Sequence, residues 1–143
     1  AAENPRVHAL VRKGRRGLGT AIVEGLRIAR EHGFAIAINI DADGSHDPDD
    51  IPRLLAAMEP VAGPPADVVV GSRRVPGGRT VGWPLARHVT SRLVGVFTRR
   101  LLGVPVRDPS SGYRAIRLSL LDSLGSPVTS GYAFHEELLW LVH

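Results

Sequence analysis

The sequence predicts one α/β domain in which helices cover both faces of a mostly parallel sheet. Short apolar runs alternate with longer segments in which apolar residues recur every three or four positions, the order that βα units produce. The best run, residues 34–40, is apolar at almost every position, as expected of a strand that is buried on both faces. A chain of 143 residues suffices for one domain with its own core.

Each element follows from a local pattern. The predicted strands are residues 7–11, 34–40 and 66–71. The predicted helices are residues 18–31, 48–58, 85–101, 118–124 and 136–142. Asp47 is a favourable N-cap for the second helix, because its carboxylate can accept from the first turn, and Pro48 suits the first helical position.

The helical period also predicts which side chains face the core. These side chains are Leu18, Ile22, Leu26 and Ala29 in the first helix, Ile51, Leu54, Leu55 and Met58 in the second, and Leu85, Val89, Leu93, Val96 and Leu101 in the long third helix. The chain starts without an initiator Met and stops at His143 inside an apolar helical pattern. We therefore expect the single domain, residues 1–143, to be incomplete at both ends.

Composition restricts the function classes. The formal net charge is +4, and Lys13 is the single lysine among many arginines. Polyanions are therefore plausible partners: nucleic acid, phosphorylated substrates or an anionic membrane face. A codon bias toward Arg, Ala and Gly is an equally good explanation. The absence of cysteine excludes disulfides and thiolate metal sites, and no apolar run has the length of a membrane span.

Three familiar binding motifs are incomplete. Gly14 to Gly19 has the glycine spacing of a phosphate-binding P-loop, but Thr20 stands where that loop needs Lys. The same glycines begin a dinucleotide-binding fingerprint, yet Ile22 occupies the position of its last glycine. The acidic residues after position 40 resemble a calcium loop, but Pro52 replaces the closing Glu.

A pair of carboxylates is the strongest candidate site. Asp41 and Asp43 follow directly after the buried run 34–40, and ligands of open α/β sheets bind at the carboxyl ends of strands. Residues two apart in an extended segment point the same way. Two hard oxygen ligands form a half-site for Mg²⁺ or Mn²⁺, which diphosphate oxygens can complete. The alternative is a solvated acidic loop, which we prefer for Asp47, Asp49 and Asp50.

Basic residues supply a candidate phosphate site. Arg73 leaves the end of the next predicted strand, at the same sheet edge as Asp41. Arg87 and Ser91 are one turn apart on the long helix, and Arg92 adjoins them. Arginine binds phosphate through a forked pair of donors, and a serine hydroxyl adds another. For a single helical arginine the alternative is a solvated surface.

Five motifs occur together in a fixed order. They are Gly17-Leu18-Gly19-Thr20-Ala21, Asp41-Ala42-Asp43-Gly44-Ser45-His46-Asp47-Pro48, Gly71-Ser72-Arg73, Gly82-Trp83-Pro84 and Asp108-Pro109-Ser110-Ser111-Gly112-Tyr113-Arg114. Gly131-Tyr132-Ala133-Phe134 follows near the end. In these motifs the whole chain resembles the dolichyl-phosphate (polyprenol-phosphate) mannosyltransferases, which belong to the inverting family 2 glycosyltransferases of GT-A fold.

The resemblance implies a three-layer GT-A sandwich, GDP-mannose as donor, a polyprenyl or dolichyl phosphate as acceptor and a divalent metal, Mg²⁺ or Mn²⁺. It implies no nucleic-acid partner, and it implies work at the cytoplasmic face of a membrane through peripheral contact. By position, Asp41 and Ala42 would contact the nucleotide sugar, and Asp43 would hold the metal with Asp41 and Ser45. Arg73 would contact the donor diphosphate or the acceptor phosphate. Arg87 and Ser91 would bind the acceptor phosphate.

The sequence departs from the family pattern in three places. Ser45 stands where some relatives carry Gln as a metal ligand. The family's opening strands, which bind the nucleotide base and ribose, have no counterpart here, and neither does a later basic loop. We therefore expect residues 1–143 alone to be poorly active.

The attacking group of such a reaction is a phosphate oxygen that is already ionised, so no strong general base is needed. Three rival hypotheses stay open. They are transfer of glucose or another hexose to a polyprenyl phosphate, a non-catalytic nucleotide-sugar-binding remnant, and a phosphohydrolase that uses Asp41 as its nucleophile. The last fits poorly because Ser45 and Lys13 do not match that pattern.

Overall fold

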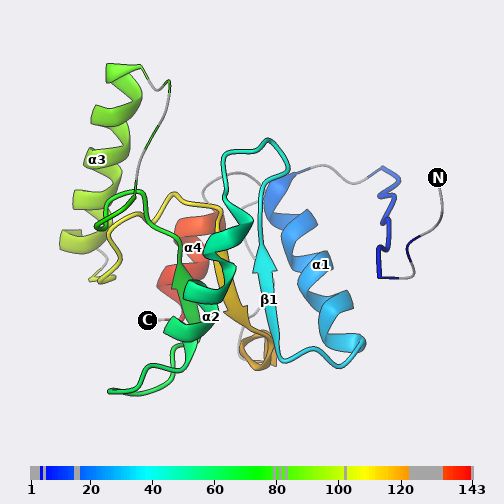
Figure 1. Ribbon diagram of the computed structural model, residues 1–143. Coiled ribbons are helices and arrows are strands. Elements are labelled where there is room, and N and C mark those ends of the chain that lie inside the picture. Colours follow the sequence, from blue (N-terminus) through cyan, green and yellow to red (C-terminus); the bar gives the residue numbers. More distant parts are fainter. Residues whose placement is uncertain are drawn as a thin grey trace.

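A computed structural model describes most of the chain. The described residues are 4, 6–14, 17–78, 80, 82, 84–101, 103–122 and 134–142, without the side chain of Arg87. In chain order the elements are α1 (Leu18–Glu31), β1 (Ile36–Asn39), the 3-10 turn η1 (Pro48–Asp50), α2 (Ile51–Met58), β2 (Val68–Val70), α3 (Leu85–Leu101), β3 (Arg114–Arg117), the 3-10 turn η2 (Leu118–Asp122) and α4 (Phe134–Leu141). The mixed α/β class is thus confirmed (Figure 1).

The sheet has the strand order β1-β3-β2. β3 lies in the centre and runs antiparallel to both neighbours, with Ala115 opposite Ile38 on one side and Val69 on the other. The prediction of a mostly parallel sheet is therefore wrong for the described strands. β1 and β2 do point the same way, but β3 separates them. The sequence pattern missed β3 because its two apolar residues stand between Arg114 and Arg117.

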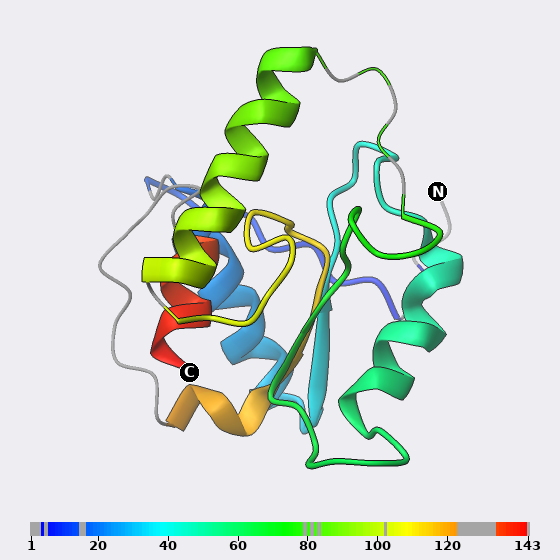
Figure 2. The ribbon, with the colours of Figure 1, turned by 90° about the vertical axis from the view of Figure 1, so that its left-hand side faces the viewer.

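Helices cover both faces of this sheet, as predicted (Figure 2). On one face Ile116 packs against Leu26 of α1 and Leu138 of α4. On the other face Ala115 packs against Leu54 and Met58 of α2. Successive strand residues point to opposite faces, so the two neighbouring residues of β3 serve the two cores.

The first two helices agree with their sequence patterns. α1 has the predicted bounds, with Leu26 buried and Ile22 and Ala29 packed beside it. Asp47 caps the turn before α2 by accepting a hydrogen bond from the backbone N–H of Asp49 at 3.0 Å. Leu55 was predicted to be buried, but 40% of it is exposed, because it lies beside the buried stripe of α2 and not within it.

All three predicted strands are shorter or absent, and the run 66–71 contributes only β2. Residues 7–11 form no strand, and Val11 is 80% exposed. The apolar run 34–40 contributes only β1, since Phe34 and Ile40 lie outside the ladder and are exposed. An apolar run becomes a strand only where a partner is available for its backbone donors and acceptors. The motif residues Trp83 and 131–133, and residues 123–124 of the predicted helix 118–124, lie outside the described residues.

The long helix α3 presents its apolar side to solvent. The prediction that this side faces the core is wrong, because its apolar residues are between 39% and 79% exposed, namely Leu85, Val89, Leu93, Val96, Phe97 and Leu101. The covered side instead contains Gly95 and Thr98, which are buried. Helical period shows that residues share a face, but it does not say which face meets the protein.

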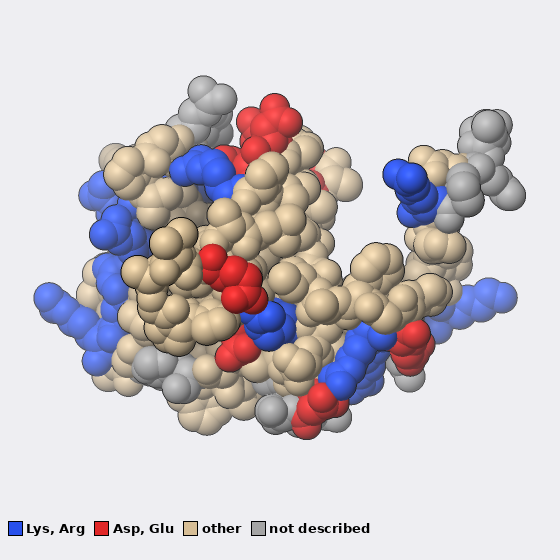
Figure 3. Space-filling view, turned by 60° about the horizontal axis from the view of Figure 1, so that its bottom comes forward, with Lys and Arg blue, Asp and Glu red and all other residues tan. Residues whose placement is uncertain are grey.

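Arginine side chains gather on the side of the molecule that carries α3. In Figure 3 several Lys and Arg side chains lie along the left edge, the side on which α3 lies in Figure 1, and others lie at the bottom and the right. Within the described part of the chain, no helix has both the length and the apolar character that crossing a membrane requires.

Candidate functional site

One cleft of about 1660 Å³ collects most of the predicted site residues. It lies where β1 and β2 end and where β3 begins, and α3 and α4 close its sides. Its lining includes the predicted residues Asp41, Ala42, Asp43, Ser45, Arg73 and Ser91. The structure thus places the carboxylate loop, Arg73 and Ser91 around one cleft, and the roles assigned to these residues stay predictions. The side chain of Arg87 lies outside the described residues.

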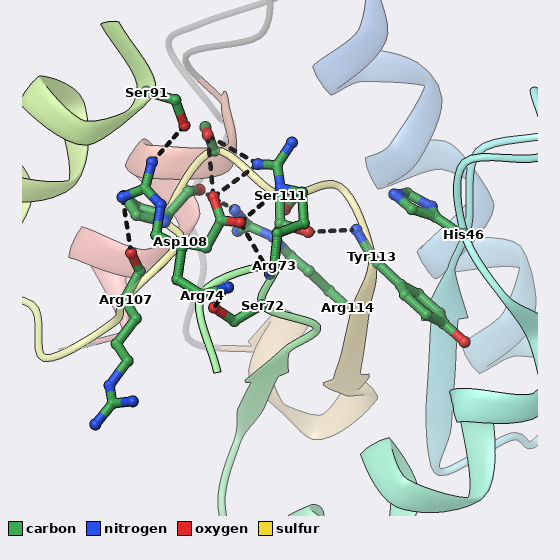
Figure 4. A network of polar contacts seen from close by, with 12 residues as sticks. His46, Ser72, Arg73, Arg74, Ser91, Arg107, Asp108, Ser111, Tyr113 and Arg114 are labelled. Atoms are coloured by element: carbon green, nitrogen blue, oxygen red, sulfur yellow. Dashed lines mark hydrogen bonds and ion pairs between the residues drawn. The ribbon is translucent and has the colours of Figure 1, made fainter. Parts of the chain in front are cut away.

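The loop after β1 is held in shape by His46 and Tyr113. The backbone N–H of Asp41 donates to Nδ1 of His46 at 3.0 Å. The His46 ring stacks on the Tyr113 ring with a centroid distance of 4.8 Å, and the Tyr113 hydroxyl donates to the carbonyl of Asp47 at 2.8 Å. Figure 4 shows the two rings side by side. The residue that precedes the central strand therefore positions both ends of the carboxylate loop.

Asp43 is held in an ionised state by its neighbour. The backbone N–H of Ser45 donates to Oδ1 of Asp43 at 2.9 Å. Hydrogen bonds from the Ser45 hydroxyl and backbone keep the pKa of Asp43 below its ordinary value of 3.8. The chain turns between them at Gly44, whose φ of +77° favours glycine. Ser45 therefore orients the Asp43 carboxylate.

The donor set suits a metal that keeps other ligands. Asp41 and Asp43 both line the cleft, but the described residues contain no group of three His, Cys, Asp or Glu side chains that could hold an ion. Mg²⁺ is commonly held by one or two protein carboxylates together with substrate phosphates and water. Two carboxylates in an open cleft fit that mode of binding.

Gly112 brings the Asp41 carboxylate and the His135 ring to one point. A Cβ atom at Gly112 would lie 3.2 Å from Oδ2 of Asp41 and 3.5 Å from Nε2 of His135. Its carbonyl accepts from Nδ2 of Asn39 at 2.6 Å, which joins this loop to the end of β1. The glycine is therefore needed for close approach and not for an unusual backbone angle.

His135 is a cleft residue that the sequence patterns did not select. It is 4% exposed, and its Nδ1 atom is buried without a hydrogen-bond partner. Burial, together with the charge of Arg114, lowers its pKa from 6.5 to about 4, so the ring is neutral near pH 7. Burial also raises the pKa of the adjoining Glu136. The polar run His135-Glu136-Glu137 at the start of an otherwise apolar helix was the available signal.

Arg73 is paired with a fully buried carboxylate. Its Nε donates to Oδ2 of Asp108 at 2.7 Å, and its Nη2 donates to Oδ1 at 2.7 Å. Burial opposes ionisation of Asp108, but the hydrogen bonds and charge of Arg73 outweigh it and lower the pKa. The forked edge of Arg73 that was predicted to meet phosphate therefore contacts Asp108 in this structure (Figure 4).

Arg74 is a second residue that the sequence patterns did not select. Its Nη2 donates to Oγ of Ser91 at 2.6 Å, and its Nη1 donates to the carbonyl of Arg107 at 3.2 Å. A Cβ atom at Gly95 would lie 2.6 Å from that Nη1 atom, so the glycine of α3 leaves room for the guanidinium. Burial lowers the pKa of Arg74. The Arg73-Arg74 doublet was the available signal.

A smaller pocket of about 400 Å³ adjoins this pair. We call it the basic pocket, and it is lined by Arg73, Arg74, Gly78, Thr80, His88, Ser91 and Arg92. Its lining contains no acidic side chain. Three guanidinium groups and two hydroxyls surround this small space, and the forked edge of one of them, Arg73, already contacts Asp108.

Arg114 ties the loop before β3 to α4. It is 1% exposed, and its guanidinium donates to the carbonyls of Ser111 at 2.8 Å, His135 at 2.7 Å and Pro109. Burial lowers its pKa to about 10, so it remains charged near pH 7. This buried cation positions His135 beside the cleft, and it explains why an arginine can begin a central strand.

The sequence matches a known protein family. Residues 1–125 match the family described as Glycosyl transferase family 2. The chain belongs to this family.

The names of individual relatives are more specific than the family description. The chain is 41% identical over 140 residues to the undecaprenyl-phosphate mannosyltransferase of Micrococcus luteus. The aligned residues make up 96% of this chain and 56% of that protein. It is 40% identical over 141 residues to the polyprenol monophosphomannose synthase of Mycolicibacterium smegmatis. Here the aligned residues make up 97% of this chain and 52% of that protein.

A relative with another sugar in its name also matches. The chain is 36% identical over 119 residues to the UDP-N-acetylglucosamine–dolichyl-phosphate N-acetylglucosaminyltransferase of Methanococcus voltae, which covers 83% of this chain and 46% of that protein. The chain thus spans about half the length of these curated relatives.

Proposed function

We propose that this chain forms the metal- and acceptor-binding part of an inverting glycosyltransferase. The enzyme would move mannose from GDP-mannose to a polyprenyl or dolichyl phosphate at the cytoplasmic face of a membrane. The observation that carries the proposal is the single cleft in which Asp41 and Asp43 face a rim that contains Arg73 and Ser91. The names of the two relatives that are 40% or more identical support mannose and a polyprenyl phosphate.

Asp41 and Asp43 would hold Mg²⁺ or Mn²⁺ together with the donor diphosphate. Bound there, the ion would neutralise the negative charge that develops on the departing nucleoside diphosphate. Ser45 would act by orienting the Asp43 carboxylate, since its backbone N–H and hydroxyl both bond to Asp43. Ala42 would contact the nucleotide sugar from the same loop.

The acceptor phosphate would bind in the basic pocket. Arg74 and Ser91 are already in contact there, with 2.6 Å between Nη2 and Oγ. Arg73 lines the same pocket, and the family resemblance adds Arg87. The forked edge of Arg73 is held by Asp108, so a phosphate that enters would meet the guanidinium groups of Arg74 and Arg92 and the serine hydroxyl.

The chemistry would be one displacement at the anomeric carbon. An acceptor phosphate oxygen forms the new bond to that carbon, and the bond from the same carbon to the diphosphate oxygen breaks. The products are a β-linked polyprenyl phosphate mannose and GDP. No proton has to be removed from the nucleophile, so positioning and charge stabilisation suffice.

The donor sugar is open to a second candidate. Similarity to the relative named for N-acetylglucosamine transfer favours, as an alternative, another hexosyl donor with the same acceptor class. A further alternative is that the chain binds a nucleotide sugar in the cleft and does not catalyse its transfer.

A lipid-extraction assay tests these possibilities. The chain and, in parallel, the complete product of its gene are incubated with Mn²⁺, a polyprenyl phosphate in detergent, and labelled GDP-mannose, UDP-glucose or UDP-N-acetylglucosamine. We expect label in the extracted lipid from GDP-mannose, with only weak turnover by residues 1–143. Label from a UDP-sugar alone would replace the donor assignment. Donor binding without label in any lipid would leave the non-catalytic role.

A further inference from the structure

His135 is a buried polar side chain that the proposed displacement does not use. It lies in the first turn of α4 and lines the cleft, although only 4% of it is exposed. Arg114 donates to its backbone carbonyl at 2.7 Å, so a buried contact fixes the position of the residue. Proteins rarely bury polar side-chain atoms without partners, and a ring held in this way at a cleft therefore suggests a ligand.

The buried atom Nδ1 decides where the ring carries its proton. Among the described residues, Nδ1 has no hydrogen-bond partner. A neutral imidazole has one N–H donor and one lone pair, and buried N–H groups without an acceptor are rarer than acceptors without a donor. Burial and the charge of Arg114 lower the pKa of the ring to about 4, so it is neutral near pH 7. Nδ1 therefore carries the lone pair, and Nε2 carries the proton.

The Nε2 donor of His135 lies near a carboxylate acceptor. A Cβ atom at Gly112 would be 3.5 Å from Nε2 of His135 and 3.2 Å from Oδ2 of Asp41. Because glycine has no Cβ, the space beside both atoms stays open. A sugar hydroxyl can accept from the N–H and donate to the carboxylate. A phosphate oxygen only accepts and is repelled by the carboxylate, so this pair of groups favours a hydroxyl over a phosphate.

This donor–acceptor pair lies between the two sites of the proposed reaction. In the loop before β3, the Ser110 hydroxyl accepts from Nη2 of Arg73 at 3.3 Å, beside the basic pocket. Two residues later, Gly112 adjoins the Asp41 carboxylate. The transferred sugar is bonded to the donor diphosphate and is attacked by the acceptor phosphate, so it must lie between the groups that hold them.

We propose that His135 is a specificity-determining residue, which donates from Nε2 to one hydroxyl of the transferred sugar while Asp41 accepts from the same hydroxyl. Asp41 has two carboxylate oxygens, so it can bind a metal through one and the hydroxyl through the other. The inference rests on the proposed function, which supplies a nucleotide sugar as the ligand. It assigns recognition of the sugar to the start of α4, apart from the basic pocket that would hold the acceptor.

Calorimetry on the complete gene product with Mn²⁺ compares the binding of GDP-mannose with that of GDP. His135→Phe keeps a planar ring but removes the donor, so it should bind GDP-mannose about three- to tenfold more weakly, the effect of one lost hydrogen bond. Its affinity for GDP should be unchanged. His135→Gln should keep most of the affinity for GDP-mannose, because its side-chain amide also carries an N–H donor. Circular dichroism checks the fold of both variants.

His32→Phe is the matched control. His32 is exposed at the end of α1 and lies outside the cleft lining, so this variant should bind both ligands as the parent does. Equal weakening of GDP-mannose and GDP in His135→Phe would overturn the inference, because a metal ligand or a residue that only shapes the cleft would affect both. Unchanged binding of GDP-mannose would overturn it as well.

GDP-mannose analogues that each lack one sugar hydroxyl identify the contact. The parent should bind one of them more weakly than GDP-mannose, and for that analogue His135→Phe should cause no further loss. A further loss with every analogue would overturn the inference.

The parent alone tests the proposed function. Binding of UDP-N-acetylglucosamine in place of GDP-mannose would overturn the donor assignment, and His135→Phe should then weaken that nucleotide sugar and spare UDP. Absence of binding to either nucleotide sugar would overturn the proposed function and this inference together. Binding of GDP-mannose that His135→Phe leaves intact would overturn this inference alone.

Discussion

Arg73 and Asp108 form a two-point ion pair that joins the loop after β2 to the loop before β3. Asp108 is fully buried, while Arg73 keeps partial access to the cleft. Because Asp108 uses the forked edge of Arg73, the neighbouring Arg74 becomes the residue that contacts Ser91. The arginine that the sequence singled out thus anchors the site, and its neighbour provides the nearer contact to the long helix.

Asp108→Asn should lower the free energy of unfolding by roughly 2–3 kcal/mol, less than for a fully buried pair because Arg73 is partly exposed. Urea denaturation measures this loss. The lowered folded pKa of Asp108 means that the pair stabilises fully above its ordinary pKa of 3.8 and stops doing so as pH falls through the folded value. The two proteins should therefore converge in stability in acid.

The exposed pair of Arg30 and Asp122 provides the control for that prediction. Asp122→Asn should change the free energy of unfolding by less than about 1 kcal/mol, because surface ion pairs contribute little. Equal losses in the two variants would mean that the Arg73–Asp108 contact adds nothing beyond a surface pair.

Gly95→Ala should displace the Arg74 guanidinium without lowering the free energy of unfolding. The added Cβ would lie 2.6 Å from Nη1 of Arg74, so the end of a flexible side chain must move. Alanine also raises helix propensity by up to about 1 kcal/mol. We expect unchanged or higher stability, but about tenfold weaker binding of inorganic phosphate in calorimetry, since a charge-assisted contact is lost.

Gly25→Ala in α1 is the matched control, because a Cβ there meets nothing within 4 Å. It should give the same gain in helix propensity and leave phosphate binding unchanged. Phosphate binding that is equal in Gly95→Ala, Gly25→Ala and the parent would remove Arg74 from the phosphate site.

His135→Gln should flatten the pH dependence of stability. In the folded chain the pKa of His135 is lowered to about 4, whereas its ordinary value is 6.5. Between these values the unfolded chain binds a proton that the folded chain does not, so the parent loses stability as pH falls. One titrating proton corresponds to a slope of about 1.4 kcal/mol per pH unit. In this pH range the free energy of unfolding of the variant should therefore depend on pH less steeply, by up to that amount.

Urea denaturation at several pH values measures that slope. Above about pH 7 the two curves should run parallel, because His135 is neutral there in both states. An unchanged slope between pH 4 and 6.5 would contradict the neutral, buried state of this histidine.

Asp43→Asn should weaken Mn²⁺ binding in the presence of GDP by about tenfold or more, because the half-site loses one of its two carboxylate ligands. Electron paramagnetic resonance of free Mn²⁺ measures the affinity, and circular dichroism checks the fold. Asp49→Asn is the control, since Asp49 is an exposed acid outside the cleft lining. An equal affinity in both variants would exclude Asp43 from the metal site.

Local patterns predicted a large part of the fold. The period of α1 and the cap at Asp47 are properties of neighbouring residues, so they were correct. β3 was missed because its stability comes from partners on both sides and from carbonyls that surround Arg114. A four-residue strand with an arginine at each end has no local signature.

The sequence by itself determined the family motifs, the carboxylate loop and the excess of arginine, because these depend on residue type and spacing alone. Only the tertiary structure decided that β3 runs between β1 and β2, that Arg74 contacts Ser91, and that His135 reaches the cleft. It also decided that the apolar side of α3 faces outward. Each of these depends on contacts between residues far apart in the chain, which a local pattern does not contain.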